Sequence, residues 1–225
     1  IRHAVRFARE AGVTSVKIVP AMHEVLAGKV RLTDIREVQV EDLLGRNPAN
    51  IETKAIASFV RGKTVLVTGA AGSIGSELAR QCITFEPKTL LLLDFNETGL
   101  FDLMEELRMS HGQLASRAKP IIASITDREK LSRIVDAAKP DVIFHAAAYK
   151  HVPLMEDFPD EAVRTNIFGT LNLAEAARKH RVPKFVFVST DKAIRPVSVM
   201  GKTKRAAELV VQADLPTGWM TGDEG

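Results

Sequence analysis

The chain has 225 residues, of which 45% are apolar and 26% charged, and its formal net charge is +3. This profile is typical of a globular protein that can bury a core, and so small a net charge does not by itself indicate a nucleic-acid or membrane-surface partner. The single cysteine, Cys82, excludes an internal disulfide and agrees with a reducing compartment. No apolar run approaches the roughly 20 residues of a membrane span.

Residues 1–60 are expected to be the tail of a preceding domain and a linker, or an arm packed on the unit C-terminal to them. Residues 4–12 (AVRFAREAG) have the pattern of a helix stopped by glycine, and residues 15–20 (SVKIVP) that of a short strand. Residues 46–50 (RNPAN) are typical of a turn. Residues 51–62 (IETKAIASFVRG) are expected to form an amphipathic helix that leads into a new unit.

From Lys63 onward, apolar runs of strand length alternate with helical segments. Near-continuous apolar runs indicate strands buried on both faces, and their alternation with helices indicates a parallel sheet. Residues 61–225 are therefore expected to form a doubly wound α/β domain, incomplete at its C-terminus. Strands are predicted at residues 64–69, 89–94, 120–125, 141–147 and 185–190, and helices at 73–85, 97–110, 128–138, 160–180 and 201–213.

A glycine-rich loop, TGAAGSIG, comes directly after the first of these strands and opens the first helix. Gly69, Gly72 and Gly75 have the spacing of a dinucleotide-binding loop, in which glycines allow a tight turn, close approach of the pyrophosphate and packing of helix on strand. The backbone N–H groups of Ser73, Ile74 and Gly75 would point at the phosphates from a positive helix end. The alternative is a purely structural tight turn.

The ends of the next strands predict the rest of a cofactor site. Asp94 closes the second strand, where a carboxylate accepts the ribose hydroxyls of NAD and repels the 2′-phosphate of NADP. Ser124 and Ile125 end the third strand and are expected to flank the adenine. Ala146 and Ala147 end the fourth strand and leave room for the nicotinamide and its ribose.

Several motifs together resemble the extended short-chain dehydrogenases, and among them the UDP-N-acetylglucosamine type of nucleotide-sugar 4,6-dehydratase. The resemblance covers roughly residues 35–213. Its long members are anchored in the bacterial inner membrane, so the resemblance implies a cytoplasmic domain of a longer, homo-oligomeric protein. The motifs are REVQVEDLLGR, TGAAGSIG, HAAAYKHVP, RTNIFGT, STDKA and the M-G-x-x-K pattern.

The resemblance implies an internal redox cycle in which NAD takes hydride from C4 of the sugar and returns it at C6, while water is lost from C5 and C6. It assigns Thr190 to the C4 oxygen, Asp191 to the acid at the C6 hydroxyl and Lys192 to the base at C5. Lys204 matches the lysine that binds the nicotinamide ribose. A carboxylate beside an amine is expected at the dry end of a strand, where pKa values shift; the alternative is a solvated turn.

Met200 stands where most of the superfamily carries a tyrosine that exchanges the C4 hydroxyl proton. A thioether has no proton to exchange. Three interpretations are open: Lys204, Lys192 or a water takes over the task; the site binds without turnover; or Met200 is core packing and the alignment is shifted. Long members of the resembled group also carry methionine here, which favours the first.

Other residues have weaker assignments. Lys150 is expected to contact the sugar nucleotide, the alternative being a surface lysine, and Asn166 is expected on the substrate side at a helix kink. His145 is more typical of a core histidine than of a catalyst, and neither it nor His151 has the company of metal ligands. Ser124 departs from the aspartate usual in the family, which weakens the expected grip on adenine.

The chain begins with Ile1, and residues 215–225 close with no obvious element, so both ends are expected to be cut. Such a chain should bind the cofactor better than the substrate. The alternatives to a dehydratase are a nucleotide-sugar epimerase, against which Asp191 and Lys192 argue, and a non-catalytic module that binds NAD or a nucleotide sugar. No nucleic-acid partner is expected.

Overall fold

A computed structural model describes residues 11, 13, 17–18, 36–37 and 53–214. The chain divides into two compact units, residues 1–52 and 53–225. In the first unit, β1 (Lys17–Ile18) pairs antiparallel with β2 (Arg36–Glu37), and β1 falls in the segment expected as a strand. The helix expected at residues 4–12 and the turn expected at 46–50 lie outside the described residues, apart from Ala11.

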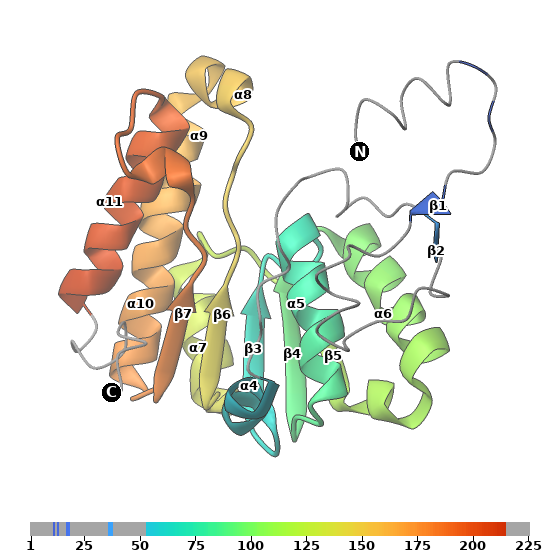
Figure 1. The fold of residues 1–225 in the computed structure, drawn as a ribbon. Helices are drawn as coiled ribbons and strands as arrows, with labels where there is room; N and C mark the ends of the chain where they lie inside the picture. The colour runs from blue at the N-terminus through green and yellow to red at the C-terminus, as the bar shows by residue number, and fades with distance from the viewer. Residues whose placement is uncertain (1–10, 12, 14–16, 19–35, 38–52, 215–225) are drawn as a thin grey trace. The chain divides into compact units, whose positions relative to one another are not determined.

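The second unit is a five-stranded parallel sheet with helices on both faces (Figure 1), as the sequence predicts. The strand order is β5-β4-β3-β6-β7. The chain adds β4 and β5 on one side of β3 and then β6 and β7 on the other, so the switch point of the sheet lies between β3 and β6. In such sheets ligands bind at the carboxyl edge beside this switch point. The strands are β3 (Thr64–Thr68), β4 (Thr89–Asp94), β5 (Ala118–Ile122), β6 (Val142–His145) and β7 (Lys184–Phe187).

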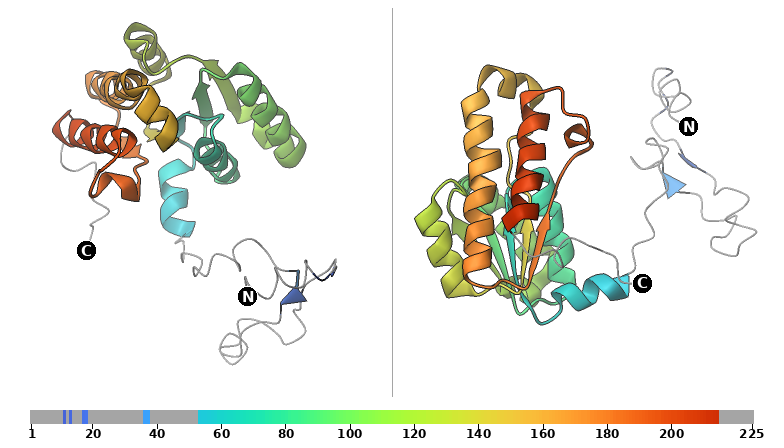
Figure 2. Two further views of the ribbon diagram at one scale, coloured as in Figure 1. Left: turned by 90° about the horizontal axis from the view of Figure 1, so that it is seen from above. Right: turned by 90° about the vertical axis from the view of Figure 1, so that its left-hand side faces the viewer.

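The helices form two layers that sandwich the sheet, as the views in Figure 2 show. α5 and α6 pack together on one face, while α10 packs against both α7 and α11 on the other. α4 precedes β3 at the amino edge of the strands (Figure 1). The helices are α4 (Thr53–Val60), α5 (Ser73–Thr84), α6 (Glu97–His111), α7 (Arg128–Ala138), α8 (Val152–Asp157), α9 (Pro159–Ala162), α10 (Thr170–Lys179) and α11 (Val199–Asp214). Short 3-10 helices cover Gly112–Arg117 and Asp191–Ala193.

Each strand divides its side chains between two cores, one on each face of the sheet. On β3, Val65 and Val67 face α5 and α6, while Leu66 packs into the core under α7, α10 and α11. All three are fully buried, which explains why the sequence shows continuous apolar runs. Cys82 lies in the first core, and burial raises the pKa of its thiol to about 12.

Several elements differ from the prediction: β6 and β7 end earlier, at His145 and Phe187, and α8 was not predicted. Two further differences have a clear cause. β5 begins at Ala118 and ends at Ile122, because its partner β4 ends at Asp94, which pairs with Ile122. Residues 123–125 are thus left as a loop at the carboxyl edge. The helix expected over 160–180 is α9 and α10 joined by a π-helical segment, Val163–Gly169. Among the described residues, no helix is long and apolar enough to cross a membrane.

Candidate active site

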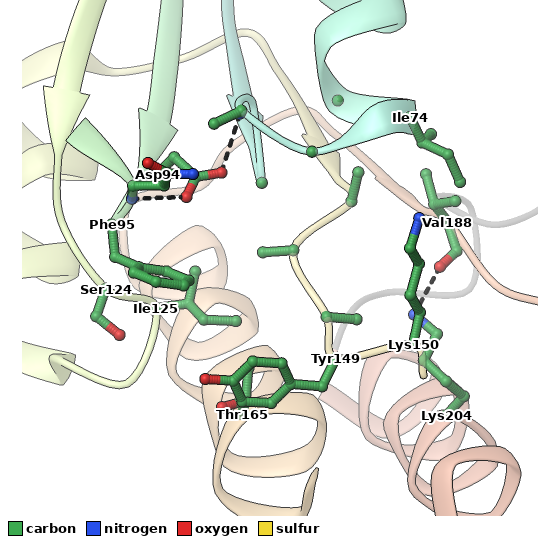
Figure 3. Close-up of a pocket in the computed structure, with 18 of the residues that line it drawn as sticks. Ile74, Asp94, Phe95, Ser124, Ile125, Tyr149, Lys150, Thr165, Val188 and Lys204 are labelled. Carbon is green, nitrogen blue, oxygen red and sulfur yellow. Dashed lines mark hydrogen bonds between the residues drawn. The ribbon is translucent and has the colours of Figure 1, made fainter. Parts of the chain in front are cut away.

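A pocket of about 830 Å³ opens at the carboxyl edge of the sheet, and residues that come after all five strands line it (Figure 3). Most residues predicted from the sequence for the site meet here. Those that line the pocket are Gly69, Gly72, Ser73, Ile74, Gly75, Asp94, Ser124, Ile125, Ala146, Ala147, Lys150, Thr190, Lys192, Met200 and Lys204. Asp191 and Asn166 are not among the lining residues.

The glycine-rich loop is folded so tightly that it depends on glycine at two positions. Gly69 has a φ of +69°, and a Cβ there would lie 2.6 Å from the Ala147 backbone. A Cβ on Gly75 would lie 2.0 Å from the carbonyl oxygen of Gly69. Within the described residues no side chain caps the start of α5, so its first amide groups stay available to an anion.

The carboxylate of Asp94 ties the glycine-rich loop to the end of β4. It accepts hydrogen bonds from the backbone N–H groups of Ala71 and Asn96, each at 3.0 Å. Each carboxylate oxygen has a second acceptor site. Because Asp94 is buried yet lines the pocket, these remaining sites can receive a pair of hydroxyl groups, as on a ribose. The loop and the carboxylate thus fit the pyrophosphate and adenosine ribose of a dinucleotide.

The residues after β5 form the far wall of the pocket. Ile125 is buried, and Ser124 exchanges a 2.7 Å hydrogen bond with the Thr126 hydroxyl and accepts one from its N–H. Phe95 is 66% exposed, and Figure 3 shows its ring extending beside Ser124 and Ile125. A planar apolar group would find both an aromatic and an aliphatic surface there.

The Thr190–Asp191–Lys192 turn begins the short 3-10 helix after β7. The Asp191 carboxylate accepts hydrogen bonds from the Thr190 hydroxyl at 2.9 Å and from Nζ of Lys192 at 3.2 Å. Both bonds hold the pKa of Asp191 below its ordinary value, and the bond from Thr190 has the larger effect. The expectation of a dry site is wrong for this pair: the 3-10 turn directs Asp191 into solvent, and its side chain is 81% exposed.

Lys204 lies at the opposite extreme, since only 6% of it is exposed. Its ammonium group donates a 2.7 Å hydrogen bond to the carbonyl oxygen of Val188 and lies 3.9 Å from the centre of the Phe187 ring. Burial lowers the pKa of Lys204 to about 8, against the smaller raising effect of Glu208. Near neutral pH, a larger fraction of Lys204 is therefore the neutral amine than for an ordinary lysine.

Met200 lies one helical turn before Lys204 and has two kinds of neighbour. It is 4% exposed and packs in a small cluster with Met155 and Ala162, against the partly buried Tyr149. It also lines the pocket. Met200 is therefore both a packing residue and part of the pocket wall.

Lys150 extends from the loop after β6 toward the glycine-rich loop. Its Nζ lies 3.5 Å from the hydroxyl oxygen of Ser73, and Figure 3 shows it pointing toward Ile74. Asn166 is instead buried in the π-helical segment and holds the backbone of Tyr149 and the hydroxyl of Thr203. These contacts give Asn166 a positioning role in place of the substrate contact expected from the sequence.

His145 is a fully buried member of a polar chain, as the sequence indicates. The Thr170 hydroxyl donates to the carbonyl oxygen of Asn166, so it accepts from Nε2 of His145, and Thr68 donates to Nδ1. Burial lowers the pKa of His145 to about 3, so the ring is neutral. Its role is to join β3, β6 and α10.

Sequence reasoning missed the part of the pocket wall formed by Glu161, Arg164 and Thr165. Their spacing of three and four residues places them on one helix face, and this is the signal that would have found them. Arg164 is 65% exposed and pairs with Glu161 at 3.2 Å. This part of the wall therefore presents an ion pair of opposite charges to the pocket.

Comparison with known proteins shows relatives over most of the chain. The family described as polysaccharide biosynthesis protein matches residues 65–218. The capsular polysaccharide biosynthesis protein CapD of Staphylococcus aureus is 44% identical over 87% of this chain and 32% of its own length. The uncharacterized membrane protein MJ1061 of Methanocaldococcus jannaschii is 47% identical over 72% of this chain and 47% of its own. The chain thus spans a third to a half of these relatives.

Other relatives and solved structures carry names of two activities. A UDP-N-acetylglucosamine 4,6-dehydratase (inverting) of Campylobacter jejuni is 33% identical over 65% of this chain and 42% of its own. The structure of DesIV, a dTDP-glucose 4,6-dehydratase from Streptomyces venezuelae with NAD and TYD bound, aligns with a TM-score of 0.58 at 26% identity, over 67% of this chain and 51% of its own. The structure of a UDP-glucose 4-epimerase of Thermotoga maritima with UDP-glucose aligns with a TM-score of 0.59 at 28% identity, over 67% of this chain and 50% of its own.

Proposed function

The chain belongs to the polysaccharide biosynthesis protein family, and from this we propose that it is the cofactor-binding part of a nucleotide-sugar 4,6-dehydratase. The proposed substrate is UDP-N-acetylglucosamine, and the proposed product is its 4-keto-6-deoxy derivative. One observation carries the proposal: the Thr190 hydroxyl, the Asp191 carboxylate and the Lys192 amine are hydrogen-bonded in a row beside the pocket that Lys204 and the glycine-rich loop line.

NAD is the proposed cofactor. The glycine-rich loop, the open start of α5 and the buried Asp94 carboxylate fit a dinucleotide, and the Streptomyces venezuelae dehydratase was solved with NAD bound. A bound NAD would supply the acceptor and donor of hydride that an internal redox cycle needs. Asp94 favours NAD over NADP because its charge repels a 2′-phosphate.

The turn after β7 is proposed to carry the dehydration. Lys192 would take the proton from C5, Asp191 would protonate the leaving C6 hydroxyl, and Thr190 would hold the C4 oxygen. Asp191 is held ionised by its neighbours, so it must gain a proton before it can act as an acid. A sugar that covers this exposed carboxylate removes water from it, which raises its pKa and favours the protonated form.

Lys204 is proposed to replace the missing phenol at position 200. Its lowered pKa, about 8, gives a neutral fraction that can accept the proton of the C4 hydroxyl near neutral pH. Lys192 is the second candidate, because it also lines the pocket. If Lys204→Ala and Lys192→Ala both left full activity, this assignment would fail.

An epimerase is the second candidate function, because a relative and several similar structures carry that name. The Asp191–Lys192 pair favours the dehydratase, since an epimerase keeps the C6 hydroxyl and needs no acid–base pair there.

The chain is further proposed to be part of a longer homo-oligomeric protein, with residues 1–60 the tail of a preceding domain and a linker. We also propose that the longer protein is held at a membrane, as the name of the Methanocaldococcus jannaschii relative suggests.

Mass spectrometry separates the possibilities. A protein of the relatives' length that contains this chain is incubated with UDP-N-acetylglucosamine and NAD. Loss of one water from the sugar nucleotide supports the dehydratase, and the Asp191→Asn variant should abolish it. A product of unchanged mass but altered chromatographic position indicates the epimerase. Binding of NAD by calorimetry with no product indicates a binding module.

A further inference from the structure

The amino edge of the sheet, opposite the pocket, is strongly basic. A lysine or arginine stands shortly before, or at the first position of, each of the five strands. Because the strands are parallel, these residues gather at one edge, where α4 also lies (Figure 1). The basic edge is defined as Lys63, Lys88, Arg117, Lys139, Arg181 and Lys184.

Direct contacts link the turns of this edge. The carbonyl oxygen of Lys63 accepts from the N–H of Lys88 at 2.8 Å, which joins the turns before β3 and β4. Arg117, before β5, donates to the carbonyl oxygen of Pro87 at 3.0 Å. At β7, Nζ of Lys184 lies 3.4 Å from the centre of the Phe59 ring on α4. The cations thus belong to one surface.

Glu86, Asp136 and Asp141 lie near this edge and offset part of its positive charge. Glu86 pairs with Arg117 at 3.9 Å, Asp141 accepts from the N–H of Thr64 at 2.8 Å, and Asp136 contacts His180 at 3.1 Å. Within residues 53–214, no carboxylate forms an ion pair with the exposed side chains of Lys63, Lys88, Lys139 or Arg181. The modest net charge of the whole chain therefore conceals a concentration of positive charge.

Two of these cations occupy backbone positions that favour glycine. Lys139 and Arg181 come after α7 and α10 with φ values of +44° and +54°. A cation is stabilised at the negative C-terminal end of a helix. For a residue other than glycine, however, the free-energy cost of the left-handed conformation is usually larger than that stabilisation. Among the described residues, the third non-glycine residue with a positive φ is the acidic Glu86, so this backbone conformation does not by itself select for cations.

We propose that the basic edge docks on an anionic phospholipid membrane surface. Phe59 is 38% exposed in the same surface, and an aromatic ring among cations is typical of a membrane interface. A nucleic acid would be favoured by several stacking aromatics along a groove, and at this edge Phe59 is the only exposed aromatic residue among the described residues. Docking by this edge turns the pocket toward the aqueous side, where soluble nucleotide sugars are found.

The choice of a membrane rests in part on the proposed membrane placement of the whole protein, and the test needs no enzymatic turnover. The 225-residue chain is sedimented with vesicles of phosphatidylcholine, with or without about one third phosphatidylglycerol. The edge variant carries Lys63→Gln, Lys88→Gln and Lys139→Gln. The matched control carries Arg128→Gln, Arg133→Gln and Lys202→Gln, which remove the same charge elsewhere.

The wild-type chain should bind only the anionic vesicles, and added salt should release it. At about fivefold per lysine, the edge variant should bind roughly a hundredfold more weakly, while the control should bind nearly as the wild type does. Melting curves establish that each variant is folded. Absence of wild-type binding at low salt, or equal losses in both variants, overturns the proposal. Binding of an RNA oligonucleotide through the same lysines, without vesicle binding, overturns it in favour of nucleic acid.

Discussion

The side-chain amide of Asn166 holds the backbone of Tyr149 from both sides. Its Oδ1 accepts from the N–H of Tyr149 at 2.8 Å, and its Nδ2 donates to the carbonyl oxygen at 3.1 Å. Nδ2 also donates to the hydroxyl of Thr203 on α11 at 3.0 Å. One buried amide thus fixes the loop after β6 and the helix that carries Met200 and Lys204.

Asn166→Asp should therefore destabilise the protein although it conserves shape. A carboxylate cannot donate, so the carbonyl oxygen of Tyr149 would face a second acceptor, at a cost of about 1–3 kcal/mol. Asn96→Asp is the matched control, because Asn96 only accepts, from the N–H of Gly99, and an aspartate does this equally well. Urea unfolding measures both variants. If the two variants were equally stable, the hydrogen bonds that Asn166 donates would not contribute to stability.

Gly75→Ala should disrupt the glycine-rich loop. The new methyl group would lie 2.0 Å from the carbonyl oxygen of Gly69, so the backbone must move. We expect a loss of about 1–3 kcal/mol in stability from overpacking and a large loss of NAD affinity by calorimetry. Gly112→Ala is the control: its φ of +52° also strains alanine, but no atom lies within 4 Å of the new Cβ. A Gly75→Ala variant that binds NAD normally would show that the loop does not hold the pyrophosphate.

Much of the fold was predictable because burial and register leave clear signals. Leu90 to Leu93 are buried in alternation on the two sheet faces, which is the pattern that a continuous apolar run of strand length predicts for a central strand. The glycine spacing likewise predicted a tight loop, since Gly69 and Gly75 leave no room for a side chain. These features leave a clear pattern in the local sequence, although long-range packing enforces them.

Features that depend on turn direction, on topology or on the details of one helical turn did not follow from the sequence patterns, although the family resemblance led us to expect a helix kink at Asn166. The π-helical segment exists beside Asn166, whose side chain is engaged by Tyr149 and Thr203, and helical periodicity does not register one extra residue in a turn. The exposure of Asp191 depends on the direction of a three-residue turn. The basic edge was invisible in the net charge, because topology brings together residues as distant as Lys63 and Lys184.

Asp94→Asn should shift cofactor preference toward NADP. The substitution removes the charge that repels a 2′-phosphate and one of the acceptors for the ribose hydroxyls. The ratio of the Kd for NADP to that for NAD, measured by calorimetry, should fall at least about tenfold. Glu97→Gln, which neutralises an exposed carboxylate three residues away, should leave the ratio unchanged. An unchanged ratio in Asp94→Asn would place the ribose elsewhere.

Met200→Leu should leave the protein nearly intact if Met200 acts by packing. The two side chains have similar volume, so the stability change should stay below about 1.5 kcal/mol. Met200→Tyr is larger and should cost about 1–3 kcal/mol in the cluster with Met155 and Ala162. Thermal unfolding gives the stabilities, and product formation by the longer protein gives the activity. Loss of activity in a stable Met200→Leu variant would show that the thioether itself takes part.

Lys204 should make stability rise with pH on the alkaline side. Burial lowers its pKa to about 8 from the ordinary 10.5, so between these values the unfolded chain holds a proton that the folded chain has lost. Stability should therefore increase by up to about 1.4 kcal/mol per pH unit in this window, roughly 3 kcal/mol in all. Urea unfolding between about pH 7.5 and about pH 10.5 should show this slope in the wild type. Lys202→Met is the control and should show the same slope, because Lys202 is exposed. The slope should be absent in Lys204→Met, and parallel curves for all three proteins would mean that Lys204 stays charged in the folded chain.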